Sequence, residues 1–111
     1  MRQNWKARIT ACLVLLMTAG TLAIPARSDD KSAATYKQKC VACHGTDGKG
    51  DTPTGKALGI HSFAKADMAK MSDQELADVI EKGKGKMPKY GSSMKPDEIK
   101  AMVAYIRTLG K

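Results

Sequence analysis

Apolar residues recur at helical spacing in three segments beyond residue 28, and no segment alternates in the way of a strand. The best marked segment is 96–109. It opens with a proline suited to a first helical turn, has two acidic residues beside the positive helix end, and stops at Gly110. Its apolar residues fall on one side, which predicts burial against a partner surface: Ile99, Met102, Val103, Ile106 and Leu109.

Two further helices are predicted from shorter patterns. One opens at Ser72, whose hydroxyl can cap the helix while Glu75 reaches back to it, and it ends at Gly83. The other covers about 31–39, has Tyr36 on its packing side, and leads directly into Cys40. The pattern therefore predicts an all-α fold of about three to four helices.

Two irregular stretches join these helices. The stretch 45–59 contains five glycines and is predicted to be a long loop, in which the glycines permit close backbone approach to a flat object. The stretch 82–95 contains the dipeptide Met87-Pro88 and no acidic residue. It is also rich in lysine: Lys82, Lys84, Lys86, Lys89 and Lys95.

Residues 1–28 are predicted to be a secretory signal peptide, because Arg2, Lys6 and Arg8 precede 16 uncharged residues, 9–24. The alternative is an uncleaved membrane anchor, since 9–26 gives 18 uncharged residues, the lower edge of what spans a bilayer. Small residues near the end of the run leave the cleavage site undecided. We expect an exported protein, free of the membrane after cleavage, with one domain over 29–111.

The net charge and the length of the chain exclude some classes of function. The 111-residue chain has a net charge of +8, but 29–111 has 15 basic and 11 acidic residues, a mild +4, and few aromatic residues. A nucleic-acid-binding surface is therefore not expected. A domain of about 80 residues buries only about 60% of its unfolded surface and usually needs a covalent or metal staple. A disulfide framework is excluded, because only Cys40 and Cys43 lie beyond the leader.

Residues 40–44 have the sequence C-x-x-C-H, the attachment motif for c-type haem. The thiols of Cys40 and Cys43 can add to the two vinyl groups of one porphyrin edge, and His44 is then in reach of the iron as proximal ligand. A disulfide, a thioredoxin-like redox pair and part of a zinc site fit less well. A disulfide would leave the small core unexplained, and a thioredoxin-like pair needs a β-α-β context that the sequence does not predict. A closed zinc site needs a fourth ligand that is not evident.

On the opposite face of the iron, the sixth coordination position is either occupied by a side chain or left open. Met87 is the preferred ligand, because Pro88 biases it toward an extended conformation from which its side chain can project. Met94 is the nearest rival, and His61 would instead give a two-histidine site. The remaining methionines beyond the leader are expected to fill the core or its gaps: Met68, Met71 and Met102.

With these motifs, the segment from Ala33 to Leu109 resembles the class I cytochromes c in their small bacterial periplasmic form. The resemblance implies a helical fold wrapped around one covalent haem. It places Tyr36, four residues before Cys40, near the crossing of the first and last helices. It also implies that a carbonyl in the loop after the motif, at Pro53 or near Leu58, orients His44, and that Met87 supplies the distal sulfur.

The expected function is that of a monomeric one-electron carrier rather than an enzyme, because His44 and Met87 together leave the iron no open position. The lysines around Met87, with Lys82, Lys84, Lys86 and Lys89 foremost, are expected to face an acidic redox partner, although loop lysines also serve solubility alone. Two alternatives stay open. One is a haem enzyme or small-ligand sensor with a labile sixth ligand, and the other is a haem subunit of a larger redox complex.

Overall fold

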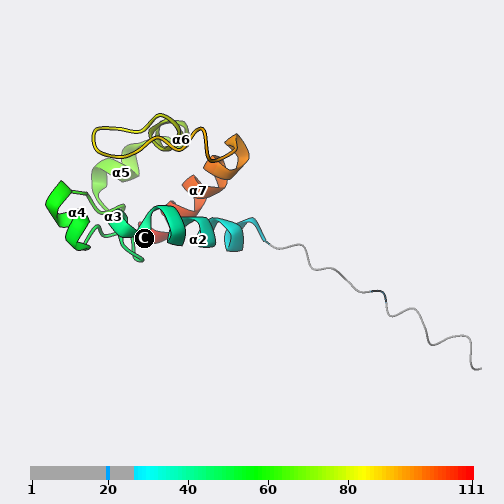
Figure 1. Cartoon of the computed structure of the whole chain (residues 1–111), viewed down its shortest axis with the longest axis horizontal. Coiled ribbons are helices and arrows are strands. Elements are labelled where there is room, and N and C mark those ends of the chain that lie inside the picture. Colours follow the sequence, from blue (N-terminus) through cyan, green and yellow to red (C-terminus); the bar gives the residue numbers. More distant parts are fainter. Residues whose placement is uncertain (1–19, 21–26) are drawn as a thin grey trace, which may run out of the picture.

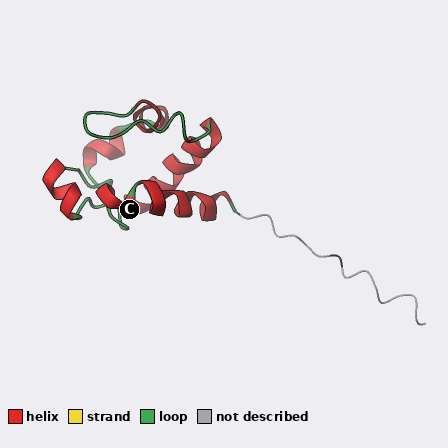
Figure 2. Ribbon diagram, in the orientation of Figure 1, coloured by secondary structure: helices red, strands yellow, loops and turns green. Residues whose placement is uncertain are grey.

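The computed structural model describes residues 20 and 27–111, so nearly all of the predicted leader, 1–28, lies outside the described residues. The described part contains helices and no strand, apart from an isolated bridge between Lys84 and Met87 (Figures 1 and 2). The all-α prediction is confirmed. The helices are α2 (Ser28–Lys39), α3 (Val41–His44), α4 (Pro53–Leu58), α5 (Ala66–Lys70), α6 (Asp73–Lys82) and α7 (Pro96–Leu109).

The first and last of these helices pack against each other, and α6 packs on α7. Figure 1 shows α2 along the lower edge of the domain, α7 crossing it obliquely toward the C-terminus, and α6 above them. The buried residues come mainly from α6 and the predicted face of α7, together with one tyrosine of α2: Tyr36, Leu76, Ile80, Met94, Ile99, Met102, Val103 and Ile106. The core therefore lies where α2, α6 and α7 meet.

The ends of α6 and α7 follow the signals in the sequence. The Ser72 hydroxyl accepts from the Glu75 N–H at 3.2 Å, and Glu75 Oε2 accepts from the Ser72 N–H at 2.7 Å. The bond from the Ser72 N–H, followed by the nearby Ser72 hydroxyl, lowers the pKa of Glu75. At the start of α7, Glu98 Oε2 accepts from the Lys95 N–H at 2.9 Å, so an acidic side chain closes the first turn although Lys95 stands at the cap position.

Three short helices were not predicted, and one of them corrects the prediction of a long loop over 45–59. Thr52 caps α4 by accepting from the Gly55 N–H at 2.8 Å, and Pro53 occupies the first turn. Gly59 then ends the helix in a left-handed conformation. The glycines mask a helix start signal of hydroxyl residue and proline, which is sufficient for six residues. Among the described residues, no helix is long and apolar enough to cross a membrane.

Candidate functional site

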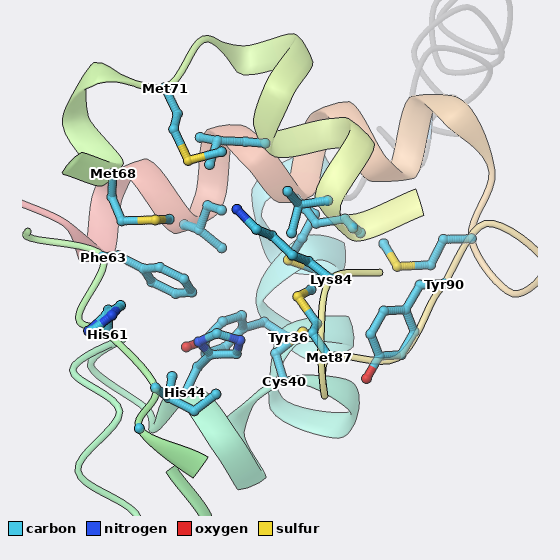
Figure 3. A pocket seen from close by; sticks show the side chains of 18 residues that line it. Tyr36, Cys40, His44, His61, Phe63, Met68, Met71, Lys84, Met87 and Tyr90 are labelled. Carbon is cyan, nitrogen blue, oxygen red and sulfur yellow. The ribbon is translucent and has the colours of Figure 1, made fainter. Parts of the chain in front are cut away.

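A cavity of about 300 Å³ lies beside the core, bordered by the end of α2, by α6 and α7, and by the irregular segments on either side of α6 (Figure 3). Its walls are mainly aliphatic, aromatic and thioether side chains. The predicted site residues Cys40, His44 and Met87 all line it, while Cys43 lies half-buried in the next turn. Segments far apart in the sequence thus converge on one apolar space.

Cys40 and His44 are held by the helix ends that flank the motif. The Cys40 N–H donates to the Tyr36 carbonyl at 2.9 Å, and the His44 N–H donates to the Cys40 carbonyl at 2.9 Å. Cys40 and Cys43 are both free thiols, so the pair forms no disulfide. Burial raises the pKa of Cys40, with Lys39 opposing and Cys43 adding to the effect, and burial lowers the pKa of His44. The imidazole is therefore kept neutral, the form that binds a metal.

The ring of His44 is oriented by stacking. Phe63 lies 4.8 Å away between ring centroids, at an interplanar angle of 21°. The Phe63 N–H donates to the Gly48 carbonyl at 3.0 Å, and a Cβ on Gly48 would come within 2.5 Å of the Phe63 ring. Glycine at this position thus lets Phe63 reach His44. Sequence reasoning gave Phe63 no role, although it is the one phenylalanine of the chain.

The expected carbonyl partner of His44 is not observed. Within the described chain, Nδ1 of His44 is buried without a hydrogen-bond partner, so neither Pro53 nor the segment near Leu58 supplies one. Both positions belong to α4 rather than to an open loop, Pro53 in its first turn and Leu58 as its last residue. A buried imidazole nitrogen without a partner is costly, and such groups in native structures often belong to sites with a redox, catalytic or ion-binding role.

Helix α4 instead supports the motif from behind. The Thr52 hydroxyl donates to the Ala42 carbonyl at 2.8 Å. Gly55 is buried, and a Cβ there would overlap the carbonyl oxygens of Gly50 and Cys43. The backbones of α3 and α4 therefore approach as closely as glycine allows. Thr52 was also missed as a site residue, and the Thr-Pro cap signal is the feature that could have revealed it.

Met87 reaches the cavity from a closed turn. The Lys84 N–H donates to the Met87 carbonyl at 3.3 Å, and the Met87 N–H donates to the Lys84 carbonyl at 3.0 Å. Gly85, with a φ of +57°, takes the first central position of this two-residue connection, as a type II′ turn requires. Figure 3 shows the Met87 side chain directed into the cavity on the side of Cys40.

The rival ligands also border the cavity. Met94 and Met102 are buried at 6% and 2% exposure and belong to the core, as expected for Met102. Met68 and Met71 line the cavity from the segment around α5 and are half-buried, in agreement with a gap-filling role. His61 is exposed, and its Nδ1 lies 2.9 Å from Lys65 Nζ, as expected of a hydrogen-bonded surface histidine.

These features fit a flat, apolar macrocycle held by the C-x-x-C-H residues better than the alternatives. No group of three or more His, Cys, Asp or Glu residues that could hold a metal ion occurs in the described ranges, which disfavours a zinc site. Residues 27–111 also form no strands that would give the β-α-β context of a thioredoxin-like pair. A helical domain whose attachment motif borders an apolar cavity defines a small cytochrome c of the class I type.

Comparison with known proteins places the chain more narrowly. Residues 27–106 match the family described as cytochrome c oxidase, cbb3-type, subunit III, and the chain belongs to this family. It is 33% identical over 82 residues to the cbb3-type cytochrome c oxidase subunit FixP of Bradyrhizobium diazoefficiens and 32% identical to FixP of Azorhizobium caulinodans. Each match covers 72% of this chain but 27% of the relative, so the chain spans about a quarter of their length.

Solved structures agree with this assignment. The KustC0563 c-type cytochrome is 35% identical, with a TM-score of 0.66, and the match covers 72% of this chain and 98% of that one. A Tyr-to-Phe mutant of Kustc0563 is 34% identical with a TM-score of 0.64, covering 70% and 96% of the two chains. The resemblance to the class I cytochromes c is thereby confirmed, and membership of the cytochrome c family implies a covalent haem c with its iron.

Proposed function

We propose that this chain is a one-electron carrier that holds a single haem c through thioether bonds to Cys40 and Cys43, with His44 and Met87 as the axial ligands. The observation that carries the proposal is the convergence of Cys40, His44 and Met87 on one apolar cavity. The haem supplies a change of one electron between ferric and ferrous iron. With an imidazole and a thioether bound, the iron has no position for substrate, so transfer rather than catalysis is favoured.

The residues of the chain set the conditions for this transfer. Burial keeps His44 neutral and Phe63 fixes its orientation. A thioether ligand favours ferrous iron more than a second imidazole does, and the aliphatic walls from α6 and α7 disfavour the extra positive charge of ferric iron. We therefore expect a positive midpoint potential.

Absorption and redox spectroscopy of the purified holoprotein tests the ligand set. The ferric protein should show the weak long-wavelength sulfur-to-iron band. Met87→Ala should abolish this band and lower the potential, whereas Met94→Ala, the matched control within the cavity, should keep the band and lose stability only. A band that survives in Met87→Ala but disappears in Met94→Ala would assign the sulfur to Met94. A purified, fully matured preparation that is colourless and has free thiols at Cys40 and Cys43 would refute haem attachment.

We propose a lysine surface as the docking site for an acidic redox partner. We define the lysine surface as Lys82, Lys84, Lys86, Lys89 and Lys95, all exposed and all flanking the Met87 turn. Lys82 is partly neutralised by Asp78 at 3.5 Å, but Lys84 borders the cavity itself. Positive charge so close to the haem site would steer an acidic partner toward the edge where electrons leave.

A role as the haem subunit of a larger redox complex is the second candidate, and the FixP relatives favour it because they are named as oxidase subunits. Purification of the native protein separates the two. A carrier is recovered as a monomer that reduces and reoxidises in solution, whereas a subunit co-purifies with the other chains of an oxidase. Rapid carbon monoxide binding to the ferrous protein at neutral pH would instead indicate a labile sixth ligand, as in a sensor or enzyme.

We also propose that residues 1–28 direct export to the periplasm and are then removed, leaving 29–111 as the cytochrome c domain. The family match begins at residue 27, at the predicted boundary, and supports this division. N-terminal sequencing of the mature protein from a periplasmic extract would test it. An intact N-terminus in the membrane fraction would favour the uncleaved anchor.

A further inference from the structure

The side chain of Tyr90 connects two segments of the site that are far apart in the sequence. Its hydroxyl donates a hydrogen bond of 3.1 Å to the carbonyl of Lys39, 51 residues away. Lys39 is the last residue of α2 and directly precedes Cys40. Carbonyls at a helix C-terminus have no partner within the helix, so the tyrosine satisfies a group that the fold leaves free.

The backbone of Tyr90 is fixed independently of this bond. Its N–H donates to the Ile80 carbonyl at 2.9 Å, and the Gly91 N–H donates to the Glu81 carbonyl at 3.0 Å, which attaches the segment to the end of α6. The Tyr90 carbonyl accepts from the Met94 N–H at 2.9 Å. The backbone of Tyr90 is thus held in place, so that its side chain can restrict the movement of neighbouring segments.

Tyr90 is also close to Met87 along the chain and in space. Two residues, Pro88 and Lys89, separate it from Met87, and the bridge to Lys84 closes the turn on the other side. Figure 3 shows the Tyr90 ring beside the Met87 side chain, and both line the cavity. Because Pro88 restricts φ in this short link, the anchored Tyr90 opposes movement of the Met87 backbone away from the site.

We infer that Tyr90 is a positioning residue for Met87: its hydroxyl ties the segment that carries the sulfur ligand to the helix that ends at the haem attachment motif. The inference rests on the proposed role of Met87 as a ligand. The bond holds the two sides of the site at a fixed separation. Without it, the turn is anchored on α6 alone, and the sulfur leaves the iron more easily.

Imidazole binding to the ferric holoprotein measures this directly, because imidazole must displace the sulfur to bind. Tyr90→Phe keeps the ring and removes the hydroxyl. One net hydrogen bond corresponds to a roughly two- to ten-fold change in an equilibrium constant, so the imidazole binding constant should rise by that factor. The sulfur-to-iron band should remain in the variant without imidazole.

Two matched variants separate positioning from general destabilisation. Tyr36→Phe removes a tyrosine hydrogen bond of 2.7 Å to Gly45, on the proximal side of the site and away from the Met87 turn. It should lower global stability, and relative to that loss it should raise imidazole binding far less than Tyr90→Phe does. Among the described residues the hydrogen bond at Tyr105 is made by its carbonyl, which accepts from the Thr108 hydroxyl, and none is seen at its own hydroxyl. Tyr105→Phe should therefore change neither quantity. The inference is wrong if the imidazole binding constant rises as much per unit of lost stability in Tyr36→Phe as it does in Tyr90→Phe.

Failure of the ligand assignment gives a different result. If Met87→Ala retains the sulfur-to-iron band, Met87 is not the ligand, and both the proposed ligand set and the inference are wrong. If Met87→Ala loses the band but Tyr90→Phe binds imidazole with the wild-type constant, the ligand assignment stands and only the positioning role of Tyr90 is refuted.

Discussion

The hydroxyl of Tyr36 donates a 2.7 Å hydrogen bond to the carbonyl of Gly45, the residue directly after His44. Tyr36 is 2% exposed, and its ring lies 5.3 Å from that of Tyr105 in α7 and 6.4 Å from that of Phe63. The expectation that Tyr36 lies near the crossing of the first and last helices is confirmed. Because Phe63 in turn stacks on His44, this tyrosine joins the helix crossing to the proximal side of the site.

Tyr36→Phe should lower the free energy of unfolding by about 1–3 kcal/mol, the cost of leaving a buried carbonyl without its donor. Denaturant unfolding of the ferric holoprotein, followed by circular dichroism, measures the loss. Tyr105→Phe is the matched control and should change stability by much less. A Tyr36→Phe variant as stable as the wild type would show that water replaces the hydroxyl at Gly45.

The same tyrosine predicts a pH dependence. Burial, and then the negative charge of neighbouring groups, raises the pKa of Tyr36 above its usual value near 10. The unfolded chain therefore loses this proton first, so the stabilising contribution is complete below about pH 10 and decreases as the pH rises further. The difference in stability between wild type and Tyr36→Phe should shrink above about pH 10 and stay constant between pH 6 and 9.

The sequence was most informative where one local signal determines one structural outcome. The apolar face and terminal signals of 96–109 gave α7 with its observed ends, and Ser72 with Glu75 gave the start of α6. The C-x-x-C-H motif indicated Cys40 and His44, which both border the cavity. What pattern alone did not reveal were contacts made at long range, such as the stacking of Phe63 on His44, because a lone aromatic residue in a loop has no periodicity to indicate its partner.

The long-loop prediction for 45–59 failed for a different reason. Its five glycines indicated irregular backbone, and several do have positive φ, including Gly45, Gly48 and Gly50. Gly55, however, is required by the close approach of α4 to the motif helix and lies within a helix. Composition does not distinguish a glycine needed for its φ from one needed for its lack of a side chain.

Gly83 should be essential for the Met87 turn. Its φ of +74° and ψ of 167° lie in a region that is accessible almost solely to glycine, and a Cβ would come within 2.7 Å of the Met87 carbonyl oxygen. Gly83→Ala should lower the free energy of unfolding by about 1–3 kcal/mol and weaken the sulfur-to-iron band. Gly85→Ala is the control, since Gly85 also has positive φ but has open space around it. The band should persist in Gly85→Ala, and equal loss in both variants would assign the effect to backbone strain alone.

The stabilising effect of the ion pair between α2 and α7 should decrease at low pH. Lys31 Nζ lies 2.6 Å from Glu98 Oε1, and this bond, followed by the bond from the Lys95 N–H, lowers the pKa of Glu98. A lowered pKa adds stability that is complete above the ordinary value of about 4.5 and is lost as the pH falls through the lower folded-state value. Glu98→Gln should therefore have a lower Tm than the wild type at pH 7. The difference in Tm between the two proteins should disappear at low pH, where Glu98 is protonated. A difference in Tm that does not change with pH would mean that the glutamine amide fails to cap the helix, and that the charge of Glu98 is not the cause.

The charge of the lysine surface can be tested with small redox probes, which need no knowledge of the natural partner. A hexacyanoferrate(III) anion should oxidise the ferrous protein faster at low ionic strength, and a tris-phenanthroline cobalt(III) cation should do so more slowly, because exposed charges are screened over about 8 Å in physiological salt. The triple variant Lys84→Glu, Lys86→Glu, Lys89→Glu should reverse these trends, slowing the anion on the order of tenfold and accelerating the cation. Lys56→Glu, an exposed lysine of α4, is the single-charge control and should change either rate only slightly. Equal rates for wild type and triple variant with both ions would place electron exit on another face of the molecule.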